Sequence, residues 1–249
     1  MGASLLGGED GAAVLVNGGG RSPYVIVCEH AGNRLPKSLG NLGLGAGDLE
    51  AHIAWDIGAE KVSRLLSRLL DAPLIVQRYS RLVYDCNRPP ESPDAIPEVS
   101  EVTAVPGNRN LSAAQRLARI REIYRPFHAA IADLLDLRAC DGVATALVTI
   151  HSFTPVYNGK PRSVELGILH DRDTRLSAKL IKGFPNVDAR FNEPYGPKDG
   201  VLHLLNMHAA PRGLRHAMIE IRNDLIAQER GQDQWAQRLS VPLIQAQTK

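Results

Sequence analysis

Two short apolar segments that each deliver a histidine constrain the fold of this chain more than any other feature. Residues 24–28 (YVIVC) are followed by Glu29 and His30, and residues 144–150 (ATALVTI) lead into His151. Continuous runs rich in Val, Ile and Leu are typical of strands that are buried on both faces of a sheet. In an open α/β sheet, ligands bind in the crevice beyond the carboxyl ends of the strands. We therefore expect the two histidines to meet in such a crevice.

The remaining segments predict a single α/β domain. Further strands are expected at 73–76, 81–84, 163–169, 187–190 and 215–221, and helices at 48–70, 112–137, 174–182, 201–207 and 232–246. Asp48 and Ser112 are the expected N-caps of the first two helices. Strands that alternate with helices indicate a mixed, mostly parallel sheet with helices on both faces. Residues 1–20 are expected to form a flexible tail with one short strand at 13–16, and residues 21–249 the domain.

Composition excludes several classes of protein. A net charge of +2 over 249 residues does not indicate binding to nucleic acid or to a membrane surface. Three cysteines are too few for a disulfide framework and favour reduced thiols in the cytoplasm. No apolar run is long enough to span a membrane, and the first 20 residues lack the features of a signal peptide. The absence of GxGxxG, P-loop and GxSxG motifs argues against dinucleotide binding, phosphoryl transfer and serine hydrolysis.

A shared metal ion is the simplest reason for two histidines to converge, because imidazole is the commonest metal ligand. Catalytic metal sites typically use three protein ligands. The helix expected at 48–70 offers His52, Asp56 and Glu60 at i, i+4 and i+8, on one side of the helix. A helical wheel places Asp56 and His52 nearer the apolar arc than Glu60, so Asp56 is the best candidate and the other two are reserves. Alternatively, all three are boundary residues whose charges are screened by solvent.

Glu220 lies within or at the end of the apolar strand expected at 215–221. A carboxylate in such a position is costly unless it is paired. We interpret Glu220 as a general base, which would take a proton from an activated water and return it to a leaving nitrogen. The alternative is a buried ion pair with an arginine from another element.

A proline-rich loop at 87–110 begins with Asn87 and Arg88. A planar guanidinium beside an amide donor suits recognition of a substrate carboxylate, and Arg81 is a candidate for a second anion contact. Alternatively, Asp85 pairs with Arg81 or Arg88 and merely fixes the loop. The length of the loop, without hydrophobic periodicity, favours a functional role.

Several motifs in a fixed order give the chain a specific resemblance. They are CEHAGNRLP at 28–36, WDIGA at 55–59, YSRLVYDCNRP at 79–89, TIHSFTP at 149–155, NEPY at 192–195 and EIRNDL at 220–225. In these motifs, and from about residue 23 to the last helix, the chain resembles the N-formylglutamate amidohydrolase family. The resemblance implies a fold similar to that of zinc-dependent exopeptidases (phosphorylase/hydrolase-like). It also implies hydrolysis of a formyl or acyl amide on an acidic amino acid.

The resemblance implies that His30 and His151 are metal ligands and that Asp56 is the third ligand. It also implies that Glu220 is the acid/base. The residues at 87 and 88 resemble the carboxylate-binding Asn-Arg pair of zinc carboxypeptidases and aspartoacylases. Family members of established activity tend to carry Pro-His-Ser-Gly and Asp-Leu-Asn-Arg where this chain has EHAG at 29–32 and DCNR at 85–88. These departures indicate a divergent branch, and they leave the acyl group and the amino acid open.

The leading hypothesis from the sequence is a cytoplasmic amidohydrolase that uses Zn²⁺, or another divalent metal, to cleave a small N-acyl amino acid. A second possibility keeps the metal but has a peptide or cell-wall amide as substrate, with loop 87–110 lining an open groove. A third is a protein without catalytic activity that binds a small carboxylate. The sequence does not indicate an oligomeric state.

Overall fold

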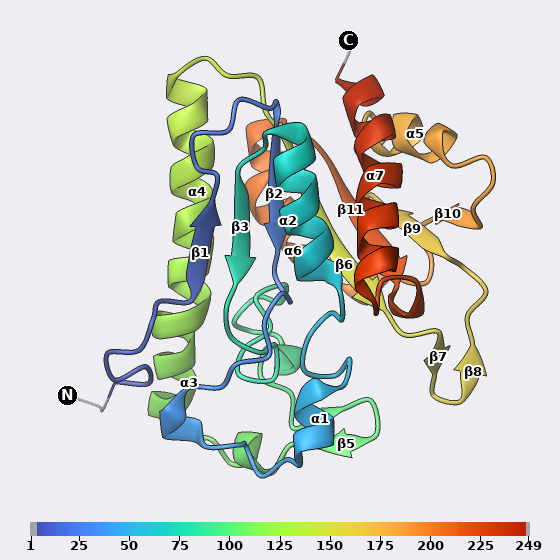
Figure 1. Ribbon diagram of the computed structural model, residues 1–249. Helices are drawn as coiled ribbons and strands as arrows, with labels where there is room; N and C mark the ends of the chain where they lie inside the picture. Colours follow the sequence, from blue (N-terminus) through green and yellow to red (C-terminus); the bar gives the residue numbers. More distant parts are fainter. Residues whose placement is uncertain (1–3, 248–249) are drawn as a thin grey trace.

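The computed structural model describes residues 4–247, and its centre is one seven-stranded sheet (Figure 1). The strand order across the sheet is β1-β3-β2-β6-β11-β9-β10. These strands are β1 (Ala13–Val16), β2 (Tyr24–Cys28), β3 (Leu74–Gln77), β6 (Ala146–Phe153), β9 (Leu166–Leu169), β10 (Ala189–Phe191) and β11 (Arg215–Arg222). All residues of β2 and β6 are buried, as expected for the continuous apolar runs that define them.

The four central strands β3, β2, β6 and β11 run parallel to one another. At one edge β1 is antiparallel to β3, and on the other side β9 is antiparallel to β11 while β10 is parallel to β9. The expected mixed, mostly parallel sheet is therefore confirmed. Because β2, β6 and β11 are parallel neighbours, their carboxyl ends lie at one edge of the domain.

Helices cover both faces of the sheet and form two cores. One core packs α2 (Ala59–Leu70), α5 (Ser177–Leu180) and α7 (Glu229–Ala246) against residues such as Ile26, Val148 and Ile219. The other packs α4 (Arg125–Cys140) and α6 (His203–His208) against residues such as Val27 and Leu147. A π-turn, Ile120–Tyr124, connects α4 to α3 (Ala113–Arg119), and Ser112 caps α3 as expected. Within residues 4–247, no helix is both long and apolar enough to cross a membrane.

The prediction of one helix over residues 48–70 is wrong, because this segment forms two helices with a turn between them. The first is α1 (Ala46–Glu50), in which Gly45 is the N-cap and the Asp48 carboxylate accepts the Gly45 N–H. The second, α2, begins only after Gly58, which adopts a left-handed φ of 80°. A Cβ at Gly58 would lie 2.2 Å from the carbonyl oxygen of Ile226, so only glycine allows this close approach. His52 and Asp56 therefore lie in the turn, and the helical-wheel argument does not apply to them.

The prediction of a strand at residues 81–84 is also wrong. The Val83 N–H bonds to the Ser80 carbonyl at 2.9 Å, and the Arg88 N–H bonds to the Asp85 carbonyl at 3.0 Å. These local bonds fold the segment into turns instead of pairing it with the sheet. Loop 87–110 carries a small hairpin of β4 (Val99–Ser100) and β5 (Thr103–Ala104), and a second hairpin joins β7 (Val156–Tyr157) to β8 (Lys160–Pro161).

The N-terminal segment is packed against the domain over its described part. Leu5 and Ala12 are buried, and the Ser4 hydroxyl donates to the Glu122 carboxylate at 2.7 Å. The strand expected at 13–16 is present as β1. Residues 1–3 of the expected tail lie outside the described residues.

A pair of buried histidines joins α4 to α6. His128 Nε2 lies 2.9 Å from the Cys86 carbonyl oxygen, so this nitrogen must carry the proton that the carbonyl accepts. His128 Nδ1 then accepts a bond of 2.8 Å from His208 Nε2. Burial lowers the pKa of His128 to about 3 and that of His208 to about 4, so both rings are neutral in the folded protein.

This pair predicts a loss of stability in mild acid. Below pH 6.5 the unfolded chain binds protons at both imidazoles whereas the folded chain does not, so the free energy of unfolding falls as the pH falls. From pH 7 to pH 5 we expect each histidine to contribute a loss of roughly 2 kcal/mol. Urea denaturation at both pH values should show a steeper loss for the wild type than for a His128→Leu, His208→Leu double variant. Equal losses would contradict the assignment.

Candidate metal centre

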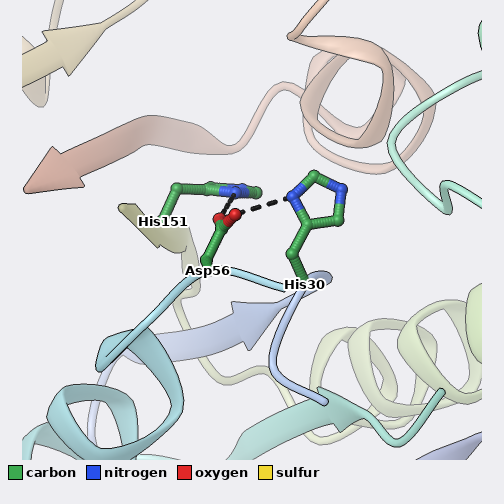
Figure 2. A group of neighbouring side chains, drawn as sticks. All are labelled: His30, Asp56 and His151. Atoms are coloured by element: carbon green, nitrogen blue, oxygen red, sulfur yellow. Dashed lines mark hydrogen bonds and ion pairs between the residues drawn. The ribbon is translucent and has the colours of Figure 1, made fainter. Parts of the chain in front are cut away.

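His30, two residues after the carboxyl end of β2, meets His151, near the carboxyl end of β6, with Asp56 between them (Figure 2). The Asp56 Oδ2 atom lies 2.9 Å from His151 Nδ1 and 3.4 Å from His30 Nδ1. The two ring centroids are 5.0 Å apart, and all three side chains are buried. The two strands thus bring together histidines that are far apart in the sequence.

Asp56 is held in this position by the turn that precedes α2. Its backbone N–H donates to the His30 carbonyl at 2.9 Å, which ties the turn to the end of β2. Its carboxylate accepts the backbone N–H of Ser152 at 3.3 Å, which ties the side chain to β6. Asp56 is therefore fixed by both strands that supply the histidines.

The three side chains fit a divalent cation. One ligand atom from each lies within 4.8 Å of the others. Ligands that bind one tetrahedral Zn²⁺ at about 2.0–2.1 Å lie about 3.3 Å apart, close to the 2.9 Å and 3.4 Å separations around Asp56. His30 Nδ1 is buried and has no hydrogen-bond partner in the described part of the chain. Two imidazoles and a carboxylate are a donor set typical of zinc.

The two reserve candidates are engaged elsewhere. His52 Nε2 pairs with the Glu101 carboxylate at 2.8 Å, in the wall of the adjoining cavity. Glu60 lies on α2 and pairs with Arg64 at 2.7 Å. Neither residue belongs to the group that could hold a cation.

Carboxylates also surround the outer sides of the two imidazole rings. Asp85 Oδ1 lies 2.7 Å from His30 Nε2, and Glu29 Oε2 lies 3.1 Å from His151 Nε2. Arg81 pairs with Asp85 at 2.9 Å and with Asp56 at 3.4 Å. Asp85 thus pairs with Arg81, as in one of the alternatives predicted from the sequence. The same carboxylate also contacts the ring of His30.

These contacts shift the pKa of each member of the group. Burial opposes ionisation of Asp56, but His30 and His151 outweigh it and hold the pKa of Asp56 well below its usual value. Burial and Arg81 oppose protonation of His30, yet Asp85 and Asp56 raise its pKa. Burial likewise opposes protonation of His151, and Glu29 and Asp56 raise its pKa well above the usual value. The site therefore stabilises positive charge between its carboxylates.

Glu220 lies on β11 directly beside His151 on β6. It is buried, and burial raises its pKa to about 7 against the opposing effect of His151. Its Oε2 atom has no hydrogen-bond partner within residues 4–247, and no arginine there forms an ion pair with it. On β9, Gly167 lies opposite, where a Cβ would come within 3.2 Å of the Glu220 Cβ. The Oε2 atom of this carboxylate therefore has no fixed partner among residues 4–247.

A cavity of about 450 Å³ adjoins the group and includes His30, Asp56, His151 and Glu220 in its lining. The other predicted binding residues, Arg81, Asn87 and Arg88, line it as well. The Asn87 side chain donates to the Val201 carbonyl and accepts the Leu204 N–H. Arg88 donates to the Gly200 carbonyl at 2.9 Å and to that of Asn87 at 3.1 Å.

The sequence did not reveal Arg162, which also lines the cavity. Its guanidinium carbon lies 4.5 Å from the ring centroid of Tyr157 and 4.9 Å from that of Tyr195. It donates to the Tyr195 hydroxyl at 3.0 Å. Arg162 follows a short hairpin and has no distinguishing pattern around it, whereas Tyr195 lies in the NEPY motif, which was a signal for its position.

Comparison with known proteins finds a family model and similar solved structures. The sequence profile of N-formylglutamate amidohydrolase matches residues 22–227. A search of curated proteins finds no significant match. A gene product of Agrobacterium tumefaciens with a crystal structure is 48% identical, with a TM-score of 0.95 and 96% of each chain covered. N-formylglutamate amidohydrolase from Ralstonia eutropha is 17% identical, with a TM-score of 0.73 over 96% of this chain and 98% of that chain, a similarity of fold alone.

The geometry predicts one divalent cation per chain. Purified protein loaded with Zn²⁺ should retain one equivalent. An Asp56→Asn variant should bind Zn²⁺ at least about 100-fold more weakly. The loss of a direct ligand should lower metal affinity by more than the 10- to 100-fold that is usual for the loss of a residue bonded to a ligand. Competition with a chromophoric chelator measures both affinities. Glu60→Gln, on the same segment but outside the group, should bind like the wild type. Unchanged affinity in Asp56→Asn would exclude Asp56 as a ligand.

Proposed function

Because this chain belongs to the N-formylglutamate amidohydrolase family, we propose that it hydrolyses an N-formyl or N-acyl amino acid with the help of a divalent cation, Zn²⁺ in the first instance. The observation that carries this proposal is the buried group of His30, Asp56 and His151 in the wall of a cavity that also contains Glu220. A cation-binding group, a nearby acid and a substrate-sized cavity are the parts that metal-assisted amide hydrolysis requires.

Each part has a separate chemical task. When bound, a divalent cation supplies Lewis-acid polarisation of the amide carbonyl and lowers the pKa of water toward about 7. Glu220 is proposed to take one proton from the attacking water and to return it to the leaving nitrogen. A C–O bond forms and the amide C–N bond breaks, which yields a carboxylic acid, formate for a formyl group, and the free amino acid. The unpartnered Oε2 of Glu220 supports this role, because it is open to a proton donor.

We propose that Arg88 and Asn87 bind the carboxylate of the substrate. Both line the cavity, and among residues 4–247 Arg88 bonds only to neutral carbonyl groups and forms no ion pair with an acid. Arg81 is more constrained, because it already pairs with Asp56 and Asp85. Its contribution to substrate binding would come from the donors that these pairs leave free.

Arg162 is a further candidate for binding anionic substrate groups. It lines the same cavity, where it donates to the Thr154 carbonyl and the Tyr195 hydroxyl and lies against the surrounding aromatic rings. No acid lies within ion-pair distance of it in the part of the chain that the structure describes. The stacked tyrosines would hold its guanidinium plane rigid.

Replacing Glu220 tests the catalytic proposal. Zinc-loaded wild type should release amino acids from N-formyl and N-acyl substrates, whereas Glu220→Gln should lower kcat by about 10²- to 10⁴-fold, the usual contribution of a general acid–base. Chromatography of the released amine measures the rate. Zinc affinity should stay near that of the wild type, since Glu220 lies outside the three-ligand group. Undiminished turnover in Glu220→Gln would exclude it as the proton carrier.

Replacing Arg88 tests the substrate class. Arg88→Ala should lower kcat/KM for N-formylglutamate by about 10- to 100-fold, because a charge-assisted hydrogen bond contributes roughly 1.5–3 kcal/mol. The same assay with the α-amide of that substrate should show little difference between Arg88→Ala and the wild type. Arg172→Ala, exposed and outside the cavity lining, is the matched control. Faster cleavage of short peptides than of any N-acyl amino acid would instead favour a peptidase.

A further inference from the structure

Glu29 is a buried acid for which the site described above has no assigned use. It directly follows β2, and its side chain is fully shielded from solvent. Neither carboxylate oxygen makes a well-aligned hydrogen bond to any residue in 4–247. A charged carboxylate in such surroundings is costly unless a positive or donating group lies beside it.

One such group is present. Glu29 Oε2 lies 3.1 Å from His151 Nε2, although the approach is more oblique than in a linear hydrogen bond. Nε2 has no other hydrogen-bond partner among the described residues. A proton on Nε2 would serve both atoms, because a carboxylate only accepts and the ring nitrogen would donate. His151 Nδ1 meets the Asp56 carboxylate at 2.9 Å; once Nδ1 gives up its proton to bind a cation, the remaining ring proton lies on Nε2, beside Glu29.

The opposite nitrogen of the same ring faces the cation group. His151 Nδ1 lies 2.9 Å from Asp56 Oδ2, and the three-residue group consists of His30, Asp56 and His151 without Glu29. The ring orientation therefore assigns Nδ1 to the cation and Nε2 to Glu29.

His30 repeats this arrangement from the neighbouring strand. Its Nδ1 faces Asp56 at 3.4 Å, and its Nε2 lies 2.7 Å from Asp85. Histidine ligands usually donate their second N–H to a carboxylate, carbonyl or water, which fixes the tautomer and raises ligand basicity. Asp85 has further partners, Arg81 and the Asn87 N–H, whereas Glu29 has, among residues 4–247, His151 alone within ion-pair distance.

We propose that Glu29 is a positioning residue that holds His151 in its Nε2-protonated tautomer, so that Nδ1 binds the cation. The inference rests on the proposed metal-dependent function and adds a residue to it. Because His151 is the one ion-pair partner of Glu29 among the described residues, a substitution at 29 should change this interaction and leave the Asp85–His30 pair in place.

The first test is the tautomer itself. Wild-type protein labelled with ¹⁵N on histidine is loaded with Zn²⁺, and two-bond ¹H–¹⁵N spectra are recorded, with His151→Gln to assign the ring. We expect His151 to carry its proton on Nε2 and to bind zinc through Nδ1. A proton on Nδ1 with zinc on Nε2 overturns the proposal. This measurement needs no variant at Glu29, so it tests the proposed tautomer of His151 even if such variants fold poorly.

The second test is zinc affinity, measured by chelator competition. Glu29→Leu should bind zinc about 10- to 100-fold more weakly than the wild type, as is usual for the loss of a partner behind a histidine ligand. Glu29→Gln should recover much of that loss, because its amide oxygen still accepts the Nε2 proton. Thr149→Val is the matched control, since Thr149 is a buried polar residue two positions before His151 on β6, and its hydroxyl also has no hydrogen-bond partner within the described chain.

The outcomes separate this inference from the proposed function. Wild type that binds no divalent cation overturns both. Wild type that binds zinc, with Glu29→Leu folded and equally tight, overturns the role of Glu29 alone. A loss of affinity in Thr149→Val equal to that in Glu29→Leu also overturns it, because the effect would then be one of general packing.

Discussion

The contact on which the site depends is one carboxylate shared by two buried imidazoles. Asp56 lies between His30 and His151 in an interior where unpaired charge is costly, so each of the three side chains requires the other two. Arg81 pairs with the carboxylates around the rings and balances part of their charge. A divalent cation would complete that balance, which gives a physical reason for a group of this composition inside the domain.

The fold positions these residues with ordinary backbone elements. Parallel pairing of β2, β6 and β11 puts their carboxyl ends side by side, and the register places Glu220 beside His151. Two turns then complete the arrangement, and they are bonded to each other, since the Arg81 N–H and the Ser80 hydroxyl both donate to the Ala54 carbonyl. Strands thus carry His151 and Glu220, His30 directly follows a strand, and the turns bring in Asp56 and Asp85.

Two site residues predicted from the sequence line the cavity, but their secondary structure differs from the prediction. The helical pattern predicts Asp56 as an inward-facing residue of a helix at 48–70, yet it lies in a turn whose geometry depends on Gly58. Arg81 was assigned to a strand, yet its segment forms turns that bond locally. In both cases apolar residues are buried without periodic secondary structure, and a pattern of hydrophobicity cannot distinguish that from a helix or a strand.

The sequence by itself determined the sheet, its two histidine-bearing strands and the family, because continuous apolar runs and ordered motifs are local features of the chain. Only the tertiary structure decided which carboxylate joins the histidines, which nitrogen of each ring faces inward, and that Glu29, Asp85 and Arg162 surround the site. These properties depend on angles and distances between residues from different strands and turns. Such geometry is set when the two cores pack against the sheet, and no local pattern of residue types encodes it.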